Sequence, residues 1–345
     1  MTSLLKIGST VSNLTTEMDK VVIGYADVKK LSIAALLSGQ HVLLEGLPGV
    51  AKSLFVEVFQ RAVRDSASVR IQMTADVKPM DIVGVKVFNP GKMQFEIELG
   101  PLVGKNFVLV DEINRAPGKT LSAVLSAMQE LRVYIAGQAT ILPDPFFVMA
   151  TQNPVEQEGV YPLPEAAVDR FGCKIVIPYA DAAVERQIQK TKALDGRDPQ
   201  NVITPVIDIG EVITLREAIK NEIYVSDAAI NYLVALVRAT RPGFEEHALV
   251  AKIDSKFAKQ IEIGASVRAQ SAIKGFARVL AAVKGRSYIL PEDIQEVAIP
   301  VLRHRIAQTF EATAEGFTTD EAAQAILKYT PFSLGEKNYT PPASR

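Results

Sequence analysis

Short hydrophobic runs alternate with helical patterns between residues 40 and 178. The runs are His41–Glu45, Val69–Met73, Asn106–Val110, Phe146–Thr151 and Lys174–Pro178. Helical patterns at Lys52–Val63 and Lys119–Leu131 lie between them, and a longer one, Asp27–Ser38, precedes the first run. Apolar runs interleaved with helices are typical of βαβ units, whose parallel sheet is covered on both faces. The pattern therefore predicts an α/β domain with a mostly parallel sheet.

Two insertions interrupt this alternation. Val85–Phe88 and Met93–Ile97 flank the turn sequence Asn89-Pro90-Gly91, which predicts a β-hairpin. Arg132–Leu142 predicts a second hairpin, with Gly137 near its tip. The two hairpins have either a functional role or, as the alternative, no role beyond being surface insertions in the domain.

Helices dominate from about Leu215 onward. The helical stretches are Ser226–Arg241, Ala265–Val283 and Glu292–Ile306, and Thr318-x-x-Glu321 resembles a capping box that opens a last helix to Lys328. The remaining Pro331–Arg345 lacks periodicity. We therefore expect an α/β core over residues 1–195, a helical domain over 215–330 and a flexible tail over 331–345.

The composition is that of an ordinary globular protein, with 48% hydrophobic and 22% charged residues. A net charge of -1 provides no global basic field that would attract nucleic acid or an anionic membrane. No apolar stretch approaches the about 18 residues that a membrane span needs, and Met1–Lys6 lacks the core of a signal peptide. The lone Cys173 excludes an internal disulfide and lies in an apolar run, so we expect a core thiol and a cytoplasmic protein.

The strongest local signal is Gly46-Leu47-Pro48-Gly49-Val50-Ala51-Lys52-Ser53, between a predicted strand and a predicted helix. In that position, consecutive backbone N–H groups and a helix N-terminus can wrap phosphates. Lys52 would lie along the β- and γ-phosphates of ATP, and the Ser53 hydroxyl would coordinate Mg²⁺. Ala51 replaces the usual glycine, which requires a negative φ there. The predicted nucleotide contacts are Gly46, Pro48, Gly49, Val50, Ala51, Lys52, Ser53 and Leu54; a glycine-rich turn with a chance lysine is the alternative.

The run Asn106–Val110 ends in the acidic pair Asp111-Glu112, which is the Walker B pattern. Asp111 would hold Mg²⁺ through water, and Glu112 would orient and deprotonate the attacking water. Parallel strands place ligand sites at their carboxyl ends, where this pair and the phosphate loop both lie. Alone, Asp111 could be an N-cap of the following helix. Together with the phosphate loop, the pair predicts an ATPase.

The runs GLPGVAKS, DEINRAPGKT, ATQNP, LPEAAVDRF and GASVRA resemble the MoxR family of AAA+ ATPases, in the family's order over about residues 20–310. Alanine before the loop lysine is common in that family, and the two hairpins match its helix-2 and pre-sensor inserts. The resemblance implies a hexameric ring with chaperone-like activity that depends on ATP and Mg²⁺. It also implies von Willebrand factor A domain partners and a role in maturing metal-containing client complexes.

The resemblance assigns roles to further polar residues. Asn153 matches the sensor-1 residue that positions the lytic water, with an Asn-Pro turn as the alternative. Arg170 matches the arginine finger that reaches a neighbouring subunit's γ-phosphate, with a surface ion pair to Asp169 as the alternative. Arg268 matches sensor 2, acting within its own subunit or on a neighbour, with a solvated helix arginine as the alternative.

Two further segments bear on the resemblance. Ile23 and Gly24, within Val21–Gly24, resemble the segment that cradles adenine, although ordinary core packing is equally compatible with the residues. Gly243–Glu262 departs from the family by intervening before the sensor-2 motif. It contains His247 and a charged run, which predict either a solvated loop or extra helical turn, or a partner-specific contact.

Two other function classes remain to be weighed. A nucleic-acid motor would need basic hairpins, but Lys86 and Lys92 are balanced by Glu96 and Glu98. A scaffold that binds nucleotide without turnover would typically lack Glu112 or Arg170, and the chain has both. We therefore favour an oligomeric ATPase that acts on a protein partner.

Overall fold

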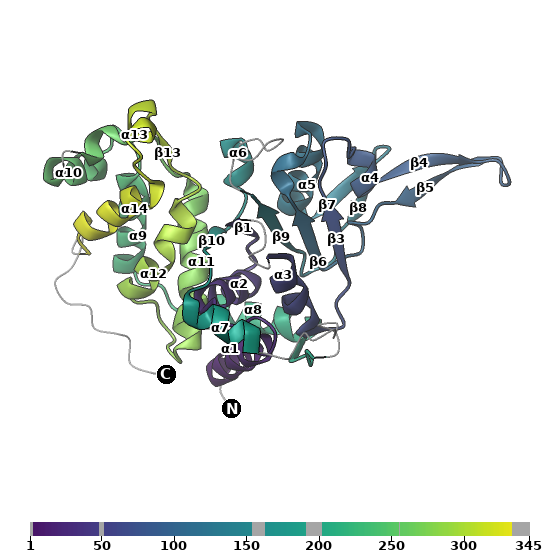
Figure 1. The fold of residues 1–345 in the computed structure, drawn as a ribbon, viewed down its shortest axis with the longest axis horizontal. Helices are drawn as coiled ribbons and strands as arrows, with labels where there is room; N and C mark the ends of the chain where they lie inside the picture. Colours follow the sequence, from purple (N-terminus) through teal and green to yellow (C-terminus); the bar gives the residue numbers. More distant parts are fainter. Residues whose placement is uncertain (1–2, 48–51, 154–162, 191–201, 255, 333–345) are drawn as a thin grey trace. The chain divides into compact units, whose positions relative to one another are not determined.

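The computed structural model describes residues 3–47, 52–153, 163–190, 202–254 and 256–332 (Figure 1). The chain divides into two compact units. The α/β unit comprises Thr10–Phe171 and Ile175–Thr214, and the helical unit comprises Met1–Ser9, Gly172–Lys174 and Leu215–Arg345. The predicted loop residues Pro48, Gly49, Val50 and Ala51, and the predicted tail from residue 333, lie outside the described residues.

The α/β unit is built on a five-stranded sheet with the order β10-β1-β9-β6-β3. Its strands are β1 (Val42–Gly46), β3 (Ser68–Gln72), β6 (Phe107–Asp111), β9 (Phe147–Gln152) and β10 (Cys173–Ile177). The pairings β1–β9, β9–β6 and β6–β3 are parallel. The predicted α/β class with a mostly parallel sheet is therefore confirmed, and each strand lies within a residue or two of its predicted bounds.

Alternate side chains of the central strands pack on opposite faces of the sheet, as the period of two requires. On one face, Phe59 contacts the rings of Phe107 and Phe147, with centroids 6.3 and 5.9 Å away. On the other, Val108 and Val148 join a core cluster with residues of α5. The helices of this unit are α1 (Ser3–Asp19), α2 (Ala26–Ser38), α3 (Lys52–Arg61), α4 (Pro79–Val83), α5 (Gly118–Glu130), α6 (Glu165–Val168) and α7 (Ala182–Lys190). The pattern had not indicated α1 or α7, and α1 contributes residues to both units.

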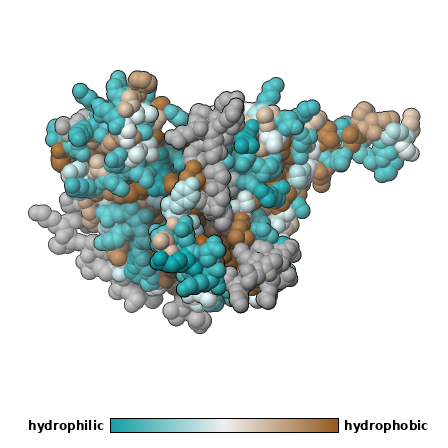
Figure 2. Space-filling view, in the orientation of Figure 1, coloured by the Kyte–Doolittle hydropathy of each residue, from teal (hydrophilic) through white to brown (hydrophobic). Residues whose placement is uncertain are grey.

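Both predicted hairpins are confirmed. They are β4 (Gly84–Asn89) with β5 (Gln94–Leu99), and β7 (Arg132–Ile135) with β8 (Gln138–Ile141). The β4–β5 hairpin extends away from the rest of its unit (Figure 1). Figure 2 shows hydrophobic surface along it, where Phe88 and Phe95 are exposed and paired at 5.2 Å. At its base Gly84 has φ 114, and a Cβ there would collide with the Glu98 carbonyl oxygen.

The second unit is mainly helical. It contains most of α8 (Ile209–Glu222), followed by α9 (Asp227–Ala239), α10 (Glu245–Ile253), α11 (Val267–Val283), α12 (Pro291–Leu302), α13 (Phe310–Ala314) and α14 (Thr319–Tyr329). The predicted capping box is confirmed, because Thr318 accepts from the Glu321 N–H while Glu321 accepts from the Thr318 N–H. Ser226 is the N-cap of α9, and its hydroxyl accepts from the Ala229 N–H.

The segment Gly243–Glu262 differs from the solvated loop or single extra turn that its charges suggested. It forms the nine-residue helix α10, and the strand β12 (Ile261–Ile263) pairs antiparallel with β13 (Ala307–Gln308). His247 is buried, with its Nδ1 2.9 Å from the Ala239 carbonyl oxygen and its ring 4.8 Å from that of Phe257. Its aromatic and backbone contacts explain why this part of a charged segment packs inward.

Cys173 is buried at the start of β10, as its apolar neighbours predicted. Burial raises the pKa of its thiol to about 12, although the nearby Arg305 and Arg303 guanidinium groups oppose the shift. No helix among the described residues is long and apolar enough to cross a membrane.

The Phe59 contacts generate a stability prediction. Phe59→Ala should lower the free energy of unfolding by about 3–5 kcal/mol, because it leaves a cavity between α3 and the sheet. Urea denaturation followed by circular dichroism measures the loss. Phe95→Ala on the hairpin is the control; Phe95 is 62% exposed, so its loss should stay under about 1 kcal/mol. Equal losses in the two variants would contradict the packing described.

Candidate active site

The carboxyl ends of three neighbouring strands bring the predicted site residues together. β1 ends at Gly46, just before the loop that leads into α3, while β6 ends at Asp111 and β9 at Gln152. The parallel pairing in the order β1-β9-β6 places these ends at one edge of the sheet. Ligands of parallel α/β sheets bind at this edge, which agrees with the predicted position of the site.

Lys52 at the start of α3 is 9% exposed, and its ammonium is held by oxygen atoms. It donates to the Asn153 Oδ1 at 2.6 Å, to the Gln152 carbonyl at 3.3 Å and to the Gly46 carbonyl. Burial lowers the pKa of Lys52, and the nearby Asp111, Glu112 and Glu45 carboxylates oppose that shift. The side chain therefore lies in a polar, enclosed position where phosphate oxygens could replace some of its present acceptors.

Asp111 is the last residue of β6, and α5 takes Pro117 as its N-cap, so the alternative of Asp111 as a helix cap is wrong. Its carboxylate accepts from the Ser53 hydroxyl at 3.1 Å, from Arg70 at 2.6 Å and from the Thr151 hydroxyl. Burial alone would raise the pKa of Asp111, but these hydrogen bonds outweigh it and hold the pKa below its usual value. The carboxylate is thus kept ionised beside Ser53.

Glu112 adopts a left-handed conformation, with φ 52 and ψ 49. That conformation is unfavourable for a residue with a side chain, and such strain often marks functional sites. The Glu112 N–H donates to the Thr151 hydroxyl at 3.0 Å, which holds the turn in place. One carboxylate oxygen lies 3.4 Å from the Asn153 Nδ2, and the other lies 3.0 Å from the Arg115 Nε.

Asn153 connects the two halves of the site. Its Oδ1 accepts from Lys52, while its Nδ2 donates to Glu112. Asn114 in turn donates its Nδ2 to the Asn153 carbonyl at 3.0 Å. The Asn114 side chain is 3% exposed, yet its Oδ1 has no hydrogen-bond partner in the described part of the chain. A buried acceptor of this kind is suited to a bound water.

Three residues of this network were missed in the sequence, namely Arg70, Asn114 and Thr151. Asn114 and Thr151 lie inside the motif runs DEINR and ATQNP, so their positions were a usable signal. Arg70 lies on β3, and only the pairing of β3 with β6 brings it to Asp111. No local pattern in the sequence indicates that contact.

The segment Val21–Gly24 connects α1 to α2, and Ile23 is buried within it. Gly24 has φ 77, and a Cβ there would lie 3.0 Å from a methyl group of Val184 on α7. The following Tyr25 donates its hydroxyl to the Pro178 carbonyl at 3.3 Å. Helix α7 and the end of β10 therefore pack against the segment predicted to receive adenine.

The two predicted arginines lie just after α6 and in α11, which supply none of the residues of the network described above. Arg170 follows α6 and is half-buried, and its Nε has no hydrogen-bond partner in the described part of the chain. Arg268 is exposed in the first turn of α11, where its N–H donates to the hydroxyl of the N-cap Ser266. Arg268 belongs to the helical unit. The roles of both arginines stay predictions.

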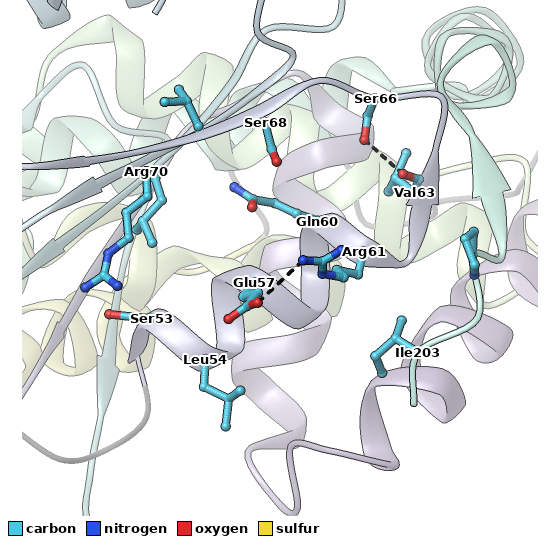
Figure 3. Close-up of a pocket in the computed structure, with 13 residues that line it drawn as sticks. Ser53, Leu54, Glu57, Gln60, Arg61, Val63, Ser66, Ser68, Arg70 and Ile203 are labelled. Atoms are coloured by element: carbon cyan, nitrogen blue, oxygen red, sulfur yellow. Dashed lines mark hydrogen bonds and ion pairs between the residues drawn. The ribbon is translucent and has the colours of Figure 1, made fainter. Parts of the chain in front are cut away.

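A cleft of about 730 Å³ opens beside Ser53, between α3 and β3 (Figure 3). Arg70 and Ser53 lie at one end of it, and Leu54 and Ile203 contribute apolar surface. Glu57 and Arg61 of α3 form an ion pair at 3.7 Å within the cleft. Among the described residues, the edge of the site at Ser53 therefore borders a large cleft.

The donor set fits a magnesium-bound nucleotide. Mg²⁺ prefers oxygen ligands and is usually held by one or two carboxylates together with phosphate oxygens. The side-chain oxygens of Asp111 and Ser53 are 3.1 Å apart, and both are of this type. Within the described residues, no group of three or more His, Cys, Asp or Glu side chains could hold a metal. A Mg²⁺ ion beside Asp111 and Ser53 would take its remaining ligands from water and from phosphate oxygens of the nucleotide.

Two family models match the chain. Residues 41–173 match the ATPase family associated with various cellular activities (AAA), and residues 254–326 match the AAA lid domain. The first match covers the sheet edge and the Lys52–Asn153 network described above. The second falls entirely within the helical unit.

Similar proteins cover nearly the whole chain. The chaperone MoxR1 of Mycobacterium tuberculosis is 41% identical over 92% of this chain and 81% of its own length. The protein MoxR of Methylorubrum extorquens is 29% identical, over 84% of this chain and 85% of its own length. A crystal structure from Cytophaga hutchinsonii, of a protein assigned as an ATPase, superposes with a TM-score of 0.84 at 38% identity. That match covers 95% of this chain and 96% of the other.

The Thr151 hydroxyl generates a prediction for the site. Thr151→Val should lower the free energy of unfolding by about 1–3 kcal/mol, because the Glu112 N–H and Asp111 both lose a buried partner. The Asp111 carboxylate stabilises the folded protein at pH values above its pKa in the unfolded chain. This stabilisation is lost as the pH falls through the lowered pKa of Asp111 in the folded protein. Since the variant raises that folded pKa, its deficit should be largest at neutral pH and narrow toward acid.

Urea denaturation between pH 7 and about pH 2 measures this deficit, because the pKa of Asp111 in the folded protein lies below its usual value of 3.8. Thr140→Val replaces another strand threonine, on the β7–β8 hairpin, and is the matched control. A deficit of the same size at all pH values, or one shared by the control, would rule out the coupling of Thr151 to Asp111.

Proposed function

The chain belongs to the MoxR family of AAA+ ATPases, and on that premise we propose that it hydrolyses Mg-ATP to remodel a protein partner. The observation that carries the proposal is the connected set of Lys52, Ser53, Asp111, Glu112 and Asn153 at the carboxyl edge of the sheet. The chemistry of these residue types suits phosphate binding, metal binding and water activation, which supports the proposal.

Residues at the start of α3 and at the end of β6 would bind the phosphates and the metal ion. Lys52 would exchange its contacts with backbone carbonyls and Asn153 for oxygen atoms of the β- and γ-phosphates. Gly46, the loop residues 48–51 and Leu54 would complete the phosphate-binding turn. Ser53 and Asp111 would hold Mg²⁺, which supplies charge neutralisation on the transferred phosphoryl group.

Glu112 is proposed as the base that orients the attacking water and accepts its proton. Its carboxylate lies between Asn153 and Arg115, so its direction is set before a substrate binds. Asn153 would keep its contact with Glu112 and turn its released Oδ1 to the water. Arg115 would have to loosen its hold for the carboxylate to reach that water.

A homo-oligomer, hexameric as the family resemblance implies, would complete the site. Arg170 would reach the γ-phosphate of a neighbouring subunit, and the open cleft beside Ser53 leaves room for approach from outside the unit. Arg268 would act as sensor 2, in its own subunit or in a neighbour. Ile23 and Gly24 would contact the adenine base.

The partner is proposed from the family and from the hairpins. One relative is named a chaperone, and we extend that activity to this chain. A von Willebrand factor A domain protein or its client complex would contact the hairpins, which the α/β core of residues 1–195 would move as ATP is hydrolysed. The helical domain over 215–330 would serve as the lid, and the protein would work in the cytoplasm.

The contacts of the hairpin lysines disfavour a nucleic-acid motor. The Lys86 ammonium lies 5.3 Å from the centre of the Phe95 ring, and Lys92 pairs with Glu96 at 2.7 Å. Phosphate binding would have to compete with these contacts on a hairpin that has little net charge.

Steady-state ATP hydrolysis against protein concentration tests the proposal. Specific activity of the wild type should rise with concentration as subunits assemble. Glu112→Gln should lose at least about a hundredfold in turnover while still binding ATP, because it removes the base and not the phosphate contacts. Arg170→Ala should lose about a thousandfold or more in turnover, because a finger arginine stabilises the charge that develops in the transition state.

Glu130→Gln is the control for the carboxylate, because Glu130 is exposed at the end of α5. It should hydrolyse ATP as the wild type does. ATP binding by the wild type without turnover at any concentration would instead indicate a partner-activated ATPase or a nucleotide-binding scaffold.

A further inference from the structure

Lys29 of α2 is a buried charge outside the proposed catalytic network. Its side chain is 1% exposed, although lysine is almost never fully buried without a partner. A buried ammonium is costly unless hydrogen bonds and an opposite charge satisfy it. The partners of Lys29 therefore show which part of the structure depends on it.

Both partners lie on the connection between α1 and α2. The ammonium donates to the carboxylate of Asp19, the last residue of α1, and to the Val22 carbonyl at 2.6 Å. Asp19 is 55% exposed, so the pair spans from the surface to the interior. The Val22 carbonyl belongs to the segment Val21–Gly24, which is proposed to contact the base.

Holding the Val22 carbonyl also fixes the neighbouring N–H. The Val22 carbonyl and the Ile23 N–H share one planar trans peptide, so they point in opposite directions. Because Lys29 holds the carbonyl by a hydrogen bond, it also fixes the orientation of the Ile23 N–H on the opposite side of that peptide. In the described part of the chain, neither the N–H nor the carbonyl of Ile23 takes part in a backbone hydrogen bond. Unpaired backbone groups on a buried residue are uncommon without a ligand or water.

The unpaired groups of Ile23 match the edge of adenine. The N–H can donate to the ring nitrogen N1, and the carbonyl can accept from the 6-amino group. Guanine presents the opposite pattern, with N1–H as a donor and O6 as an acceptor, so the same peptide groups would oppose it. The direction of these groups is therefore a device for base selection.

We propose that Lys29 is a positioning residue for the nucleotide base, which sets the Val22–Ile23 peptide so that the Ile23 backbone selects adenine over guanine. The inference rests on the proposed function, because it takes Val21–Gly24 as the base site. Lys29 touches neither the phosphates nor the reacting atoms, and it acts only through the peptide that it holds.

Binding of ATP, GTP and inorganic tripolyphosphate to the Lys29→Met variant tests the proposal. Methionine fills a similar volume without the charge. ATP should bind about tenfold more weakly, as for the loss of one or two hydrogen bonds, and the preference for ATP over GTP should shrink. Tripolyphosphate, which needs only the phosphate loop, should bind as it does to the wild type. In hydrolysis assays, KM should rise while kcat at saturating ATP stays unchanged.

Two further variants make the result specific. Lys30→Met removes the same charge from the next position of α2, where the side chain is 40% exposed, and should leave all three affinities unchanged. Asp19→Asn takes away the counterion at the surface end and should weaken ATP selectively but less than Lys29→Met. Thermal unfolding confirms that each variant is folded.

Several outcomes would overturn the proposal. Equal weakening of ATP and tripolyphosphate in Lys29→Met and Asp19→Asn would mean that the ion pair only supports the fold. Unchanged ATP binding in both variants would remove any role in base binding. If the wild type binds ATP no better than tripolyphosphate, the base site and this inference both fail. Hydrolysis that still depends on Glu112 would then preserve the proposed ATPase.

Discussion

The ammonium of Lys52 is the contact on which the arrangement of the site depends. It is enclosed at the sheet edge and bonded to Gly46, which ends β1, and to Gln152 and Asn153, at and just after the end of β9. A buried positive charge needs such oxygen atoms, and here they come from two strands that pair in parallel. The same charge sits near Asp111 and Glu112, which must stay ionised for their proposed roles. The residues proposed to bind phosphate and those proposed to activate water are thus held together before any ligand enters.

Hydrogen bonds also hold the ends of neighbouring strands in fixed positions relative to one another. Thr151 bridges Asp111 and Glu112, and Asn114 holds the backbone of Asn153. Glu112 stays in an unfavourable left-handed conformation because these neighbours over-determine it. A ligand that captures Lys52 would free one oxygen of Asn153 without disturbing the rest. Nucleotide binding would then require an exchange of partners and little rebuilding of the backbone.

Features that depend on local sequence could be predicted, whereas those that depend on contacts between distant parts of the chain could not. Strand periodicity predicted the sheet strands to within a residue or two, and turn residues predicted both hairpins. The acidic pair after an apolar run predicted that Asp111 lies at a strand end. Arg70 and Lys29 escaped notice, because their importance comes from contacts with Asp111 and Val22 that only the folded chain creates. The prediction for the charged segment around His247 was wrong for a related reason. His247 is buried against the Phe257 ring and the Ala239 carbonyl, although its charged neighbours suggest a solvated residue.

The single thiol of Cys173 has a practical consequence for experiments in solution. A cysteine with a pKa of about 12 and no exposed surface is almost entirely protonated at neutral pH, so alkylating reagents will scarcely modify it in the folded protein. Cysteines can therefore be introduced one at a time, for example along the β4–β5 hairpin, and labelled without reaction of Cys173. Fluorescent or spin labels placed there could follow the hairpin through an ATPase cycle without removing a native residue. Modification of Cys173 itself would mark only molecules whose β10 has opened.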